Sequence, residues 1–271
     1  MKIFIAGGTG FIGKPTVNEL KRRGHSVFIL SRAVHGGLSE ISDWGDAVGD
    51  FSPDVALNLV WEGIPAFDIK TTATNVANTL NLFNFLAKIR CPKVITVSSC
   101  VEYEDPAREK HGFLREGKLF LARCAERYSA ETDTKFIRAL PFFVYGPGQR
   151  EESLLPSVIK KLLNGQDPEV HRPTMAHDFV FVDDVAGALV GLAESEVVHG
   201  VYDVGTGSLK SVGEMVNTAL AAFGREPMYD TSPESGDPVA RTALIKNAIG
   251  WEPSTSVPQG ISRMIEYYKT R

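Results

Sequence analysis

Residues 1–32, MKIFIAGGTGFIGKPTVNELKRRGHSVFILSR, decide the fold that the sequence predicts. The apolar run at 2–6 is typical of a buried strand, and four glycines follow within the next seven residues. A helix is expected next, ending at Gly24, and a second apolar run lies at 27–30. The stretch therefore predicts a β-α-β unit.

Three of the glycines have physical tasks in such a turn. Gly7 permits a tight bend, Gly10 lets the backbone approach a pyrophosphate, and Gly13 lets the helix pack closely against the strand. The phosphates would lie on the free N–H groups and the positive dipole end of the helix. The pattern follows a strand, opens a helix and precedes a second strand, which is the context of a dinucleotide site. A plain structural turn is the alternative.

The composition excludes several classes of function. The 271 residues are 43% apolar and 23% charged, which suits one α/β domain with a small appended lobe. A net charge of −4 without a large basic cluster argues against nucleic-acid binding. The odd cysteine count without C-x-x-C spacing favours a reducing, cytoplasmic location, and the scattered histidines predict no metal site. No apolar stretch has membrane-spanning length, so no membrane partner is expected.

The end of the second predicted strand bears on the choice of cofactor. An NAD site usually has an acidic residue there for the ribose 2′-hydroxyl, whereas an arginine suits a 2′-phosphate. The sequence has Ser31 followed by Arg32. We therefore expect NADP rather than NAD, the alternative being that Arg32 is an ordinary solvated loop cation.

The spacing G-x-x-G-x-x-G, with Phe11 and Ile12 inside it, resembles that of the extended short-chain dehydrogenase/reductase family, which modifies nucleotide sugars. The matching segments cover nearly the whole chain: DVALNLVW (54–61), NVANTLNLF (75–83), SSCVEYE (98–104), PFFVYGPGQR (141–150), HDFVFVDDVAGALVGLAE (177–194), VYDVGTG (201–207) and IGWEP (249–253).

The resemblance implies an α/β fold, with a Rossmann-type doubly wound parallel sheet and a small C-terminal α/β substrate lobe. Residues 1–150 would bind NAD(P), with 175–205 returning to that domain, and 151–271 would mainly bind the substrate. Between 33 and 53 we expect a short third strand at 47–48 without the helix that normally follows it. The family's helix that begins at Asn75 packs across a dimer interface, so a homodimer is implied, unless its apolar stripe only covers the sheet.

Carried over position by position, the resemblance implies a cofactor set in which Asp50 is the acid near the adenine. The residues are Gly7, Gly10, Phe11, Ile12, Gly13, Ser31, Arg32, Asp50, Leu59, Val60, Asn75, Lys118, Pro141, Phe143 and Val144.

The catalytic residues implied by the resemblance are Ser99 and Lys118. Lys118 matches the lysine of the family's Y-x-x-x-K, a spacing that puts both side chains on one helix face. The tyrosine position, however, is Leu114, which cannot transfer a proton. A second register, with Ala122 at the lysine position, leaves the pair equally incomplete. Three side chains could replace the acid or be ordinary surface and supporting residues: Tyr103, His111 and Glu116.

The substrate is implied by W-E-G at 61–63 and C-V-E-Y at 100–103, which resemble a subgroup of deoxysugar reductases. At the positions of two family arginines that bind a diphosphate, this sequence has His177 and Glu234. Arg150, Arg172 or Arg241 would substitute for them or be surface charge; the alternative is a substrate that is not a common nucleotide sugar. The candidate substrate residues are Trp61, Ser99, Cys100, Tyr103, Arg150, His177 and Arg241.

The leading hypothesis is an NAD(P)-dependent nucleotide-sugar oxidoreductase or epimerase, with a 4-keto-deoxysugar reductase or epimerase favoured. The alternative is a non-catalytic NAD(P)-binding sensor or partner subunit, suggested by Leu114. An RNA-associated relative is disfavoured by the acidic charge balance.

Overall fold

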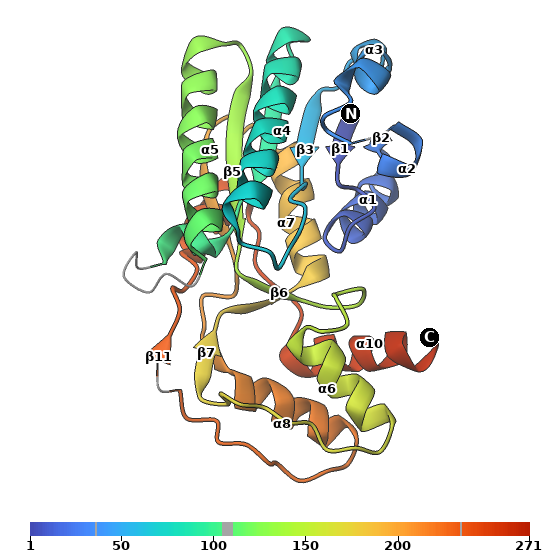
Figure 1. Cartoon of the computed structure of the whole chain (residues 1–271), viewed down its shortest axis with the longest axis vertical. Helices are drawn as coiled ribbons and strands as arrows, with labels where there is room; N and C mark the ends of the chain where they lie inside the picture. The colour runs from blue at the N-terminus through green and yellow to red at the C-terminus, as the bar shows by residue number, and fades with distance from the viewer. Residues whose placement is uncertain (36, 105–110, 234) are drawn as a thin grey trace.

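A six-stranded parallel sheet forms one half of the molecule (Figure 1). The computed structural model describes residues 1–35, 37–104, 111–233 and 235–271. In spatial order the strands are β2 (Ser26–Leu30), β1 (Lys2–Ala6), β3 (Val55–Asn58), β4 (Lys93–Val97), β5 (Lys135–Pro141) and β9 (Gly200–Val204).

All neighbouring strands of this sheet are parallel, so their carboxyl ends meet at one edge. At that edge Ala6 pairs with Leu30 on one side and with Asn58 on the other. Ligands of open parallel sheets bind outside the carboxyl ends of the strands. The glycine loop and the segments after β3 and β4 therefore lie where a ligand is expected.

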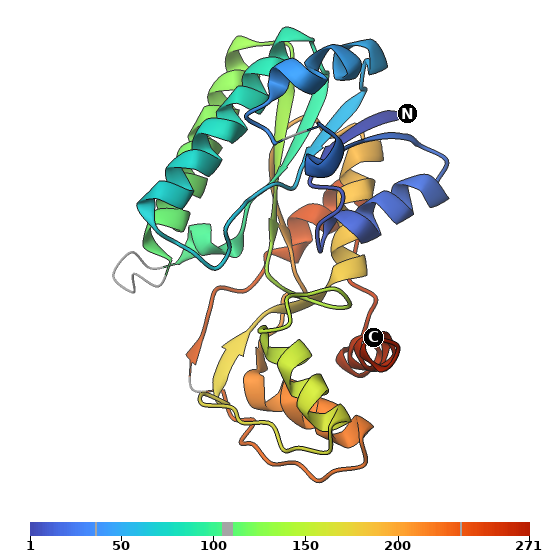
Figure 2. The same ribbon diagram turned by 45° about the vertical axis from the view of Figure 1, so that its right-hand side comes forward.

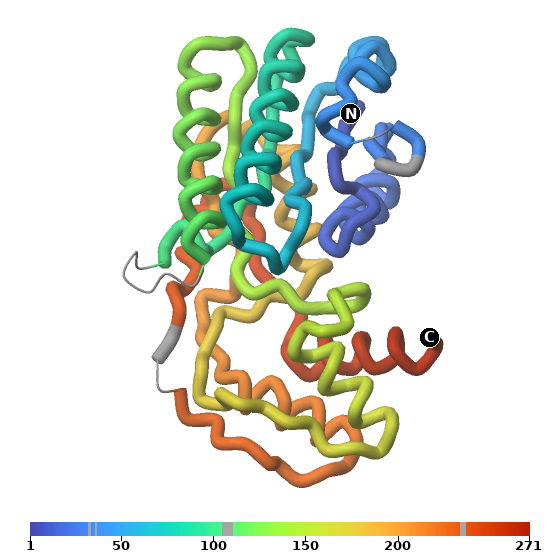
Figure 3. The backbone as a smooth tube through the Cα atoms, viewed as in Figure 1, coloured from blue at the N-terminus to red at the C-terminus, as the bar shows by residue number. Residues whose placement is uncertain are grey.

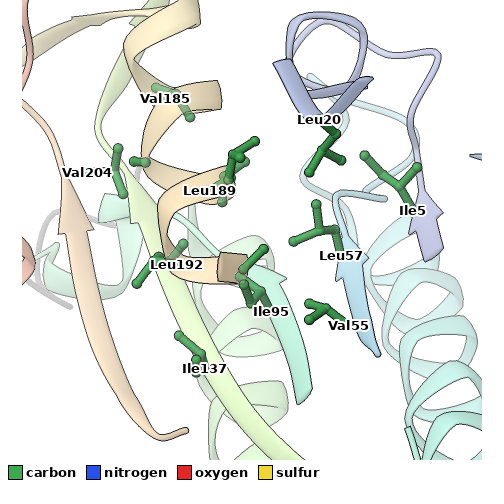
Figure 4. Close-up of a cluster of buried hydrophobic side chains, with 14 of the residues drawn as sticks. Ile5, Leu20, Val55, Leu57, Ile95, Ile137, Val185, Leu189, Leu192 and Val204 are labelled. Carbon is green, nitrogen blue, oxygen red and sulfur yellow. The ribbon is translucent and has the colours of Figure 1, made fainter. Parts of the chain in front are cut away.

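Helices cover both faces of the sheet, which confirms the predicted doubly wound fold. One face packs against α1 (Gly13–Arg22) and α7 (Val182–Glu194) through the apolar cluster shown in Figure 4. The other face packs against α3 (Ile41–Phe51), α4 (Ile69–Lys88) and α5 (Gly112–Glu131). Because both faces are covered, the central strands β1 and β3 are apolar except at Lys2, the first residue of β1, and Asn58, the last residue of β3.

The third strand that the sequence predicted at 47–48 is wrong, because α3 occupies this segment. The buried side chains Trp44 and Val48 are four residues apart, which is a helical spacing, whereas Ala47 is exposed. The Trp44 ring stacks on Phe4 of β1 at a centroid distance of 5.9 Å. The acids Asp43, Asp46 and Asp50 lie on the exposed side of α3, whereas Gly45 is buried beside Trp44.

The second half of the molecule has its own apolar cluster and extends below the carboxyl edge of the sheet in Figures 2 and 3. Its helices are α6 (Leu154–Leu163), α8 (Val212–Ala222) and α10 (Val257–Lys269). Its strands are β6 (Phe143–Tyr145), β7 (Met175–His177), β8 (Phe179–Phe181), β10 (Lys210–Ser211) and β11 (Ser235–Gly236). The division at residue 150 into cofactor and substrate domains stays a prediction.

A buried carboxylate, Asp178, ties three segments together between these two halves. It accepts hydrogen bonds from the backbone N–H groups of Thr206, Gly207 and Ala240 and from the Thr206 hydroxyl, at 2.6–3.1 Å. Charged hydrogen bonds of this kind are among the stronger ones in proteins.

No helix in the described part of the chain is long and apolar enough to cross a membrane.

Candidate functional site

The glycine loop turns sharply between β1 and α1. Gly7 has a φ of +87°, and the Gly10 N–H donates to the Gly7 carbonyl at 3.0 Å. A Cβ atom at Gly13 would lie 2.0 Å from the Gly7 carbonyl oxygen, so only glycine fits there. Within the described residues, no side chain caps the first turn of α1. Its N-terminal dipole can therefore meet an anion such as a pyrophosphate.

A cleft of about 330 Å³ opens beside this loop. Six residues that the sequence predicted line it together: Gly7, Gly10, Leu59, Val60, Trp61 and Arg150. Glu62 and Gly63, which belong to the W-E-G segment, also line it. The sequence did not predict a role in the site for the other lining residues, which are Thr9, Leu30, Gly37, Leu38 and Ile64. Gly37 and Gly63 were the sequence features that could have indicated the two loops, at 37–38 and 61–64, that line the cleft. A cleft of this volume lies within the usual range of small-molecule sites.

Several predicted cofactor residues lie outside this lining. Phe11 and Ile12 pack on the apolar clusters, and Asp50 is exposed on α3. Ser31 lies at the end of β2, where its N–H donates to His35 Nδ1 at 3.2 Å. Arg32 begins the short helix α2 (Arg32–His35), and its side chain lies outside the described residues. These assignments stay predictions.

Asn75 shapes the cleft without lining it. Its side chain is buried in α4 and makes two hydrogen bonds to the backbone of Glu62, at 2.7 and 3.0 Å, and one to the Thr71 carbonyl. The loop that carries Trp61 is thereby fixed to α4. A buried amide with several partners holds a loop more firmly than an exposed one.

Lys118 is buried beneath Trp61. Its Nζ atom lies 4.1 Å from the centre of the indole ring and donates to the Val97 carbonyl at 3.2 Å. Burial lowers the pKa of this ammonium from the usual 10.5 to about 8, while the negative charge of Glu102 opposes the shift. One turn earlier in α5, Leu114 is only 6% exposed and offers no proton.

The lowered pKa of Lys118 predicts a pH dependence of stability. Between pH 8 and 10.5 the unfolded chain holds this proton and the folded chain has lost it, so the free energy of unfolding should rise with pH. The rise cannot exceed about 1.4 kcal/mol per pH unit for one group. Denaturant unfolding of the wild type and of Lys118→Met across this window measures it. The two curves should converge as the pH rises, and a constant difference would contradict the assignment.

Residues after β4 form a second group beside Lys118. Ser99 caps the 3₁₀ helix η1 (Cys100–Tyr103), and its hydroxyl accepts from the Val101 N–H at 3.3 Å. The neighbouring Ser98 donates to the Glu102 carboxylate, which also pairs with Arg138 of β5. Cys100 is buried, which raises the pKa of its thiol to about 12, so the thiol stays protonated and unreactive at neutral pH.

Tyr103 and Arg241 are held by a buried carboxylate. The Tyr103 hydroxyl donates to Asp203 Oδ1 at 2.7 Å, and Arg241 Nε donates to Asp203 Oδ2 at 3.0 Å. Burial, together with this hydrogen bond, raises the pKa of Tyr103 well above its usual range. The interpretation of Tyr103 as the replacement acid is therefore not favoured by its environment. The ion pair with Asp203 likewise occupies the Arg241 guanidinium.

The other two candidate acids are also engaged elsewhere. His111 Nδ1 lies 2.6 Å from Glu104 Oε1, and its ring packs edge-on against Phe67. Glu116 pairs with Arg115 at 2.8 Å, and its side chain is 69% exposed. Neither residue lines the cleft.

A larger hollow of about 710 Å³ lies in the second half of the molecule, beside β6, β7 and α6. Phe143, Val144, Arg172 and His177 line it. The rings of Phe143 and His177 stack at 3.9 Å, and His177 Nδ1 lies 2.8 Å from Asp237 Oδ2. Pro141, the last residue of β5, lies two residues before Phe143 in the sequence. Arg150 lines the cleft beside the glycine loop rather than this hollow. Glu234 lies outside the described residues.

In the described part of the chain no cluster of His, Cys, Asp and Glu could hold a metal ion. The site thus consists of a glycine loop, a cleft, a buried lysine and a second hollow.

Comparison with known proteins agrees with this arrangement. The family model of the NAD dependent epimerase/dehydratase family matches residues 3–205. The CDP-abequose synthase of Salmonella typhimurium is 26% identical over 294 residues, covering 97% of each chain.

Solved structures show the same fold. UDP-glucose 4-epimerase from Thermotoga maritima, with UDP-glucose, superposes with a TM-score of 0.83 at 22% identity, over 100% of this chain and 99% of that one. RMD from Pseudomonas aeruginosa, complexed with NADPH, gives a TM-score of 0.84 at 20% identity, over 99% of each chain.

Proposed function

Because the chain belongs to the NAD-dependent epimerase/dehydratase family, whose model spans residues 3–205, we propose that this enzyme reduces or epimerises a 4-keto-deoxysugar carried on a nucleotide. The observation that carries the proposal is the cleft that joins the glycine loop to Trp61, with Lys118 directly beneath that indole. The similarity to CDP-abequose synthase, which is named for a CDP-linked sugar, supports a nucleotide-linked substrate.

The residues present fit a nicotinamide dinucleotide. Gly7, Gly10 and the first turn of α1 would hold the pyrophosphate, and Leu59 and Val60 would line the path of the nicotinamide half. The cofactor, when bound, supplies or accepts a hydride. The protein must then hold the sugar carbonyl and move one proton.

Two side chains suit these tasks. The Ser99 hydroxyl, at the carboxyl end of β4, would donate a hydrogen bond to the carbonyl or alcohol of the sugar. Lys118 would hold cofactor hydroxyls and move the proton, because Leu114 cannot and the pKa of Lys118 lies near neutrality. Trp61 would form the wall of the sugar site above this ammonium.

The second hollow would accept the nucleotide. Its stacked rings, Phe143 and His177, offer aromatic surface to a base, and Arg172 offers positive charge to a diphosphate. The relatives compared above are named for enzymes, so they give no support to a non-catalytic subunit. A homodimer through α4, the helix that contains Asn75, stays a prediction. The exposed apolar side chains Ile69 of α4 and Phe113 and Phe120 of the neighbouring α5 are consistent with it.

The preference for NADP is a separate prediction. If Arg32 pairs with a 2′-phosphate, NADPH should bind more tightly than NADH by about tenfold or more, the worth of one charged hydrogen bond. Arg32→Gln should weaken NADPH and leave NADH unchanged. Calorimetric titration of both variants with both cofactors measures this. Equal losses for both cofactors would place Arg32 elsewhere.

The experiment that tests the function offers the wild type reduced cofactor and a panel of nucleotide-linked 4-keto sugars, and follows the reduced-nicotinamide absorbance. Consumption with at least one deoxysugar nucleotide, and none with the free sugar, is the expected result. Tight cofactor binding without turnover on any member of the panel would favour the non-catalytic alternative.

A further inference from the structure

A largely buried ion pair joins η1 to β5. Glu102 of η1 and Arg138 of β5 approach to 2.5 Å, and their side chains are only 5% and 12% exposed. Arg138 occupies a strand whose neighbouring positions are apolar, with the buried residues Phe136 and Leu140 two positions away on either side. In such a strand an apolar side chain would be the ordinary choice, since removing two charges from water is costly.

The same carboxylate fixes the turn that carries the predicted catalytic serine. Ser98 donates its hydroxyl to Glu102, and the Glu102 N–H donates to the Ser99 carbonyl at 3.2 Å. The Ser98 N–H is itself anchored to the Ala139 carbonyl of β5. The Glu102 side chain thus joins the turn to Arg138 of β5. This attachment lies next to the one by which the Ala139 carbonyl of β5 holds the Ser98 backbone.

Arg138 and Ser98 also line a small cavity with Lys118 and Trp61. Glu102 acts electrostatically on Lys118 across this cluster. The cluster holds two cations, the buried Lys118 and the largely buried Arg138, and a single buried anion among the described residues, Glu102. Glu126 on α5 also approaches Arg138, at 3.6 Å, but its side chain is 69% exposed and its charge is screened by water.

We propose that Glu102 is a positioning residue for the reaction, whose carboxylate anchors the Ser98–Ser99 turn to Arg138 and serves as the counterion of Lys118. The proposal rests on the proposed function for its kinetic consequence, but not for its electrostatic one. Loss of the Glu102 charge removes an attraction that favours the protonated lysine. Lys118 then loses its proton at a lower pH, and the serine turn loses one of its two attachments to β5.

The test uses the full-length protein carrying Glu102→Gln, which keeps the shape and a hydrogen-bond acceptor but removes the charge. The pH-rate profile should show the limb that reports loss of the Lys118 proton moving down by about one pH unit. The kcat should fall at neutral pH, while the KM for the cofactor stays unchanged. Glu126→Gln is the matched control, because it removes the exposed carboxylate next to Arg138 and should leave the profile in place.

A second readout needs no turnover. In Glu102→Gln the stability rise that reports Lys118 should begin below pH 8, and combining it with Lys118→Met should remove the rise entirely. If the stability rise begins below pH 8 in Glu102→Gln but no sugar is turned over, the proposed function is contradicted. The electrostatic coupling between Glu102 and Lys118 is then still supported. If sugar is turned over but neither the profile nor the stability window moves, Glu102 is merely structural and the inference is overturned.

A further variant covers the case in which Glu102→Gln does not fold. Ser98→Ala removes one hydrogen bond to the carboxylate and leaves the ion pair with Arg138 intact. It should lower kcat without changing cofactor affinity. An unchanged kcat would remove the support for the anchoring role.

Discussion

Gly13→Ala should destroy cofactor binding and destabilise the fold. The new Cβ atom would lie 2.0 Å from the Gly7 carbonyl oxygen and 2.7 Å from Gly8 Cα, both of which are backbone atoms that cannot rotate away. To make room, either the glycine loop or the start of α1 must move. Overpacking of this kind costs about 1–3 kcal/mol or more, and the displaced loop no longer presents its N–H groups to a pyrophosphate.

Thermal unfolding and calorimetric titration with NADPH measure the two effects of Gly13→Ala. The matched control is Gly49→Ala in α3, where a Cβ atom meets nothing within 4 Å. That change should keep cofactor affinity and raise stability by about 0.5–1 kcal/mol, because alanine is the better helix former. A Gly13→Ala protein that binds cofactor as the wild type does would contradict the assignment of the loop.

Lys118→Met should raise stability while it removes activity. Methionine fills a similar volume without a charge, so the buried ammonium, whose pKa is lowered to about 8, is no longer a cost to folding at neutral pH. The expected gain is on the order of 1 kcal/mol, since the lost hydrogen bond to Val97 offsets part of it. The kcat should fall by about 10²–10⁴, the usual worth of a positioned proton donor.

Lys93→Met is the matched control for the expected result that Lys118→Met raises stability and lowers kcat. Lys93 is also buried, and burial lowers its pKa, but its Nζ donates to the carbonyls of Leu192, Ala193 and Ser195 near the end of α7. Its loss should destabilise the protein and leave kcat unchanged. If Lys118→Met instead kept its kcat, the proton would have to move through another group.

The sequence predicted the elements whose signals are local. The strand, glycine turn, helix and second strand at the start of the chain are each specified by neighbouring residues, and the structure places them as expected. The repeated β-α pattern likewise predicts a parallel sheet with helices on both faces. Leu114 and Lys118 lie in one helix, α5, as their spacing of four residues predicts.

Three features could not be predicted because they depend on packing between distant segments. The prediction of a strand at 47–48 was wrong because Trp44 and Val48 form one buried helix face, which becomes apparent only from their packing on β1 and α4. The pairing of Glu102 with Arg138 joins residues 36 positions apart, and only the arginine inside an apolar strand hinted at it. The engagement of Tyr103 and Arg241 with Asp203 is equally non-local.

The most direct test of the account measures hydride transfer in the wild type, which has leucine at the family's tyrosine position. Cofactor carrying deuterium at C4 of the reduced nicotinamide is mixed with a nucleotide-linked 4-keto-deoxysugar, and the product is analysed by mass spectrometry. We predict that one deuterium appears on the sugar, and that Lys118→Met slows its appearance by about 10²–10⁴ without loss of folding. Unlabelled sugar, recovered from protein that has bound the cofactor, would contradict the account.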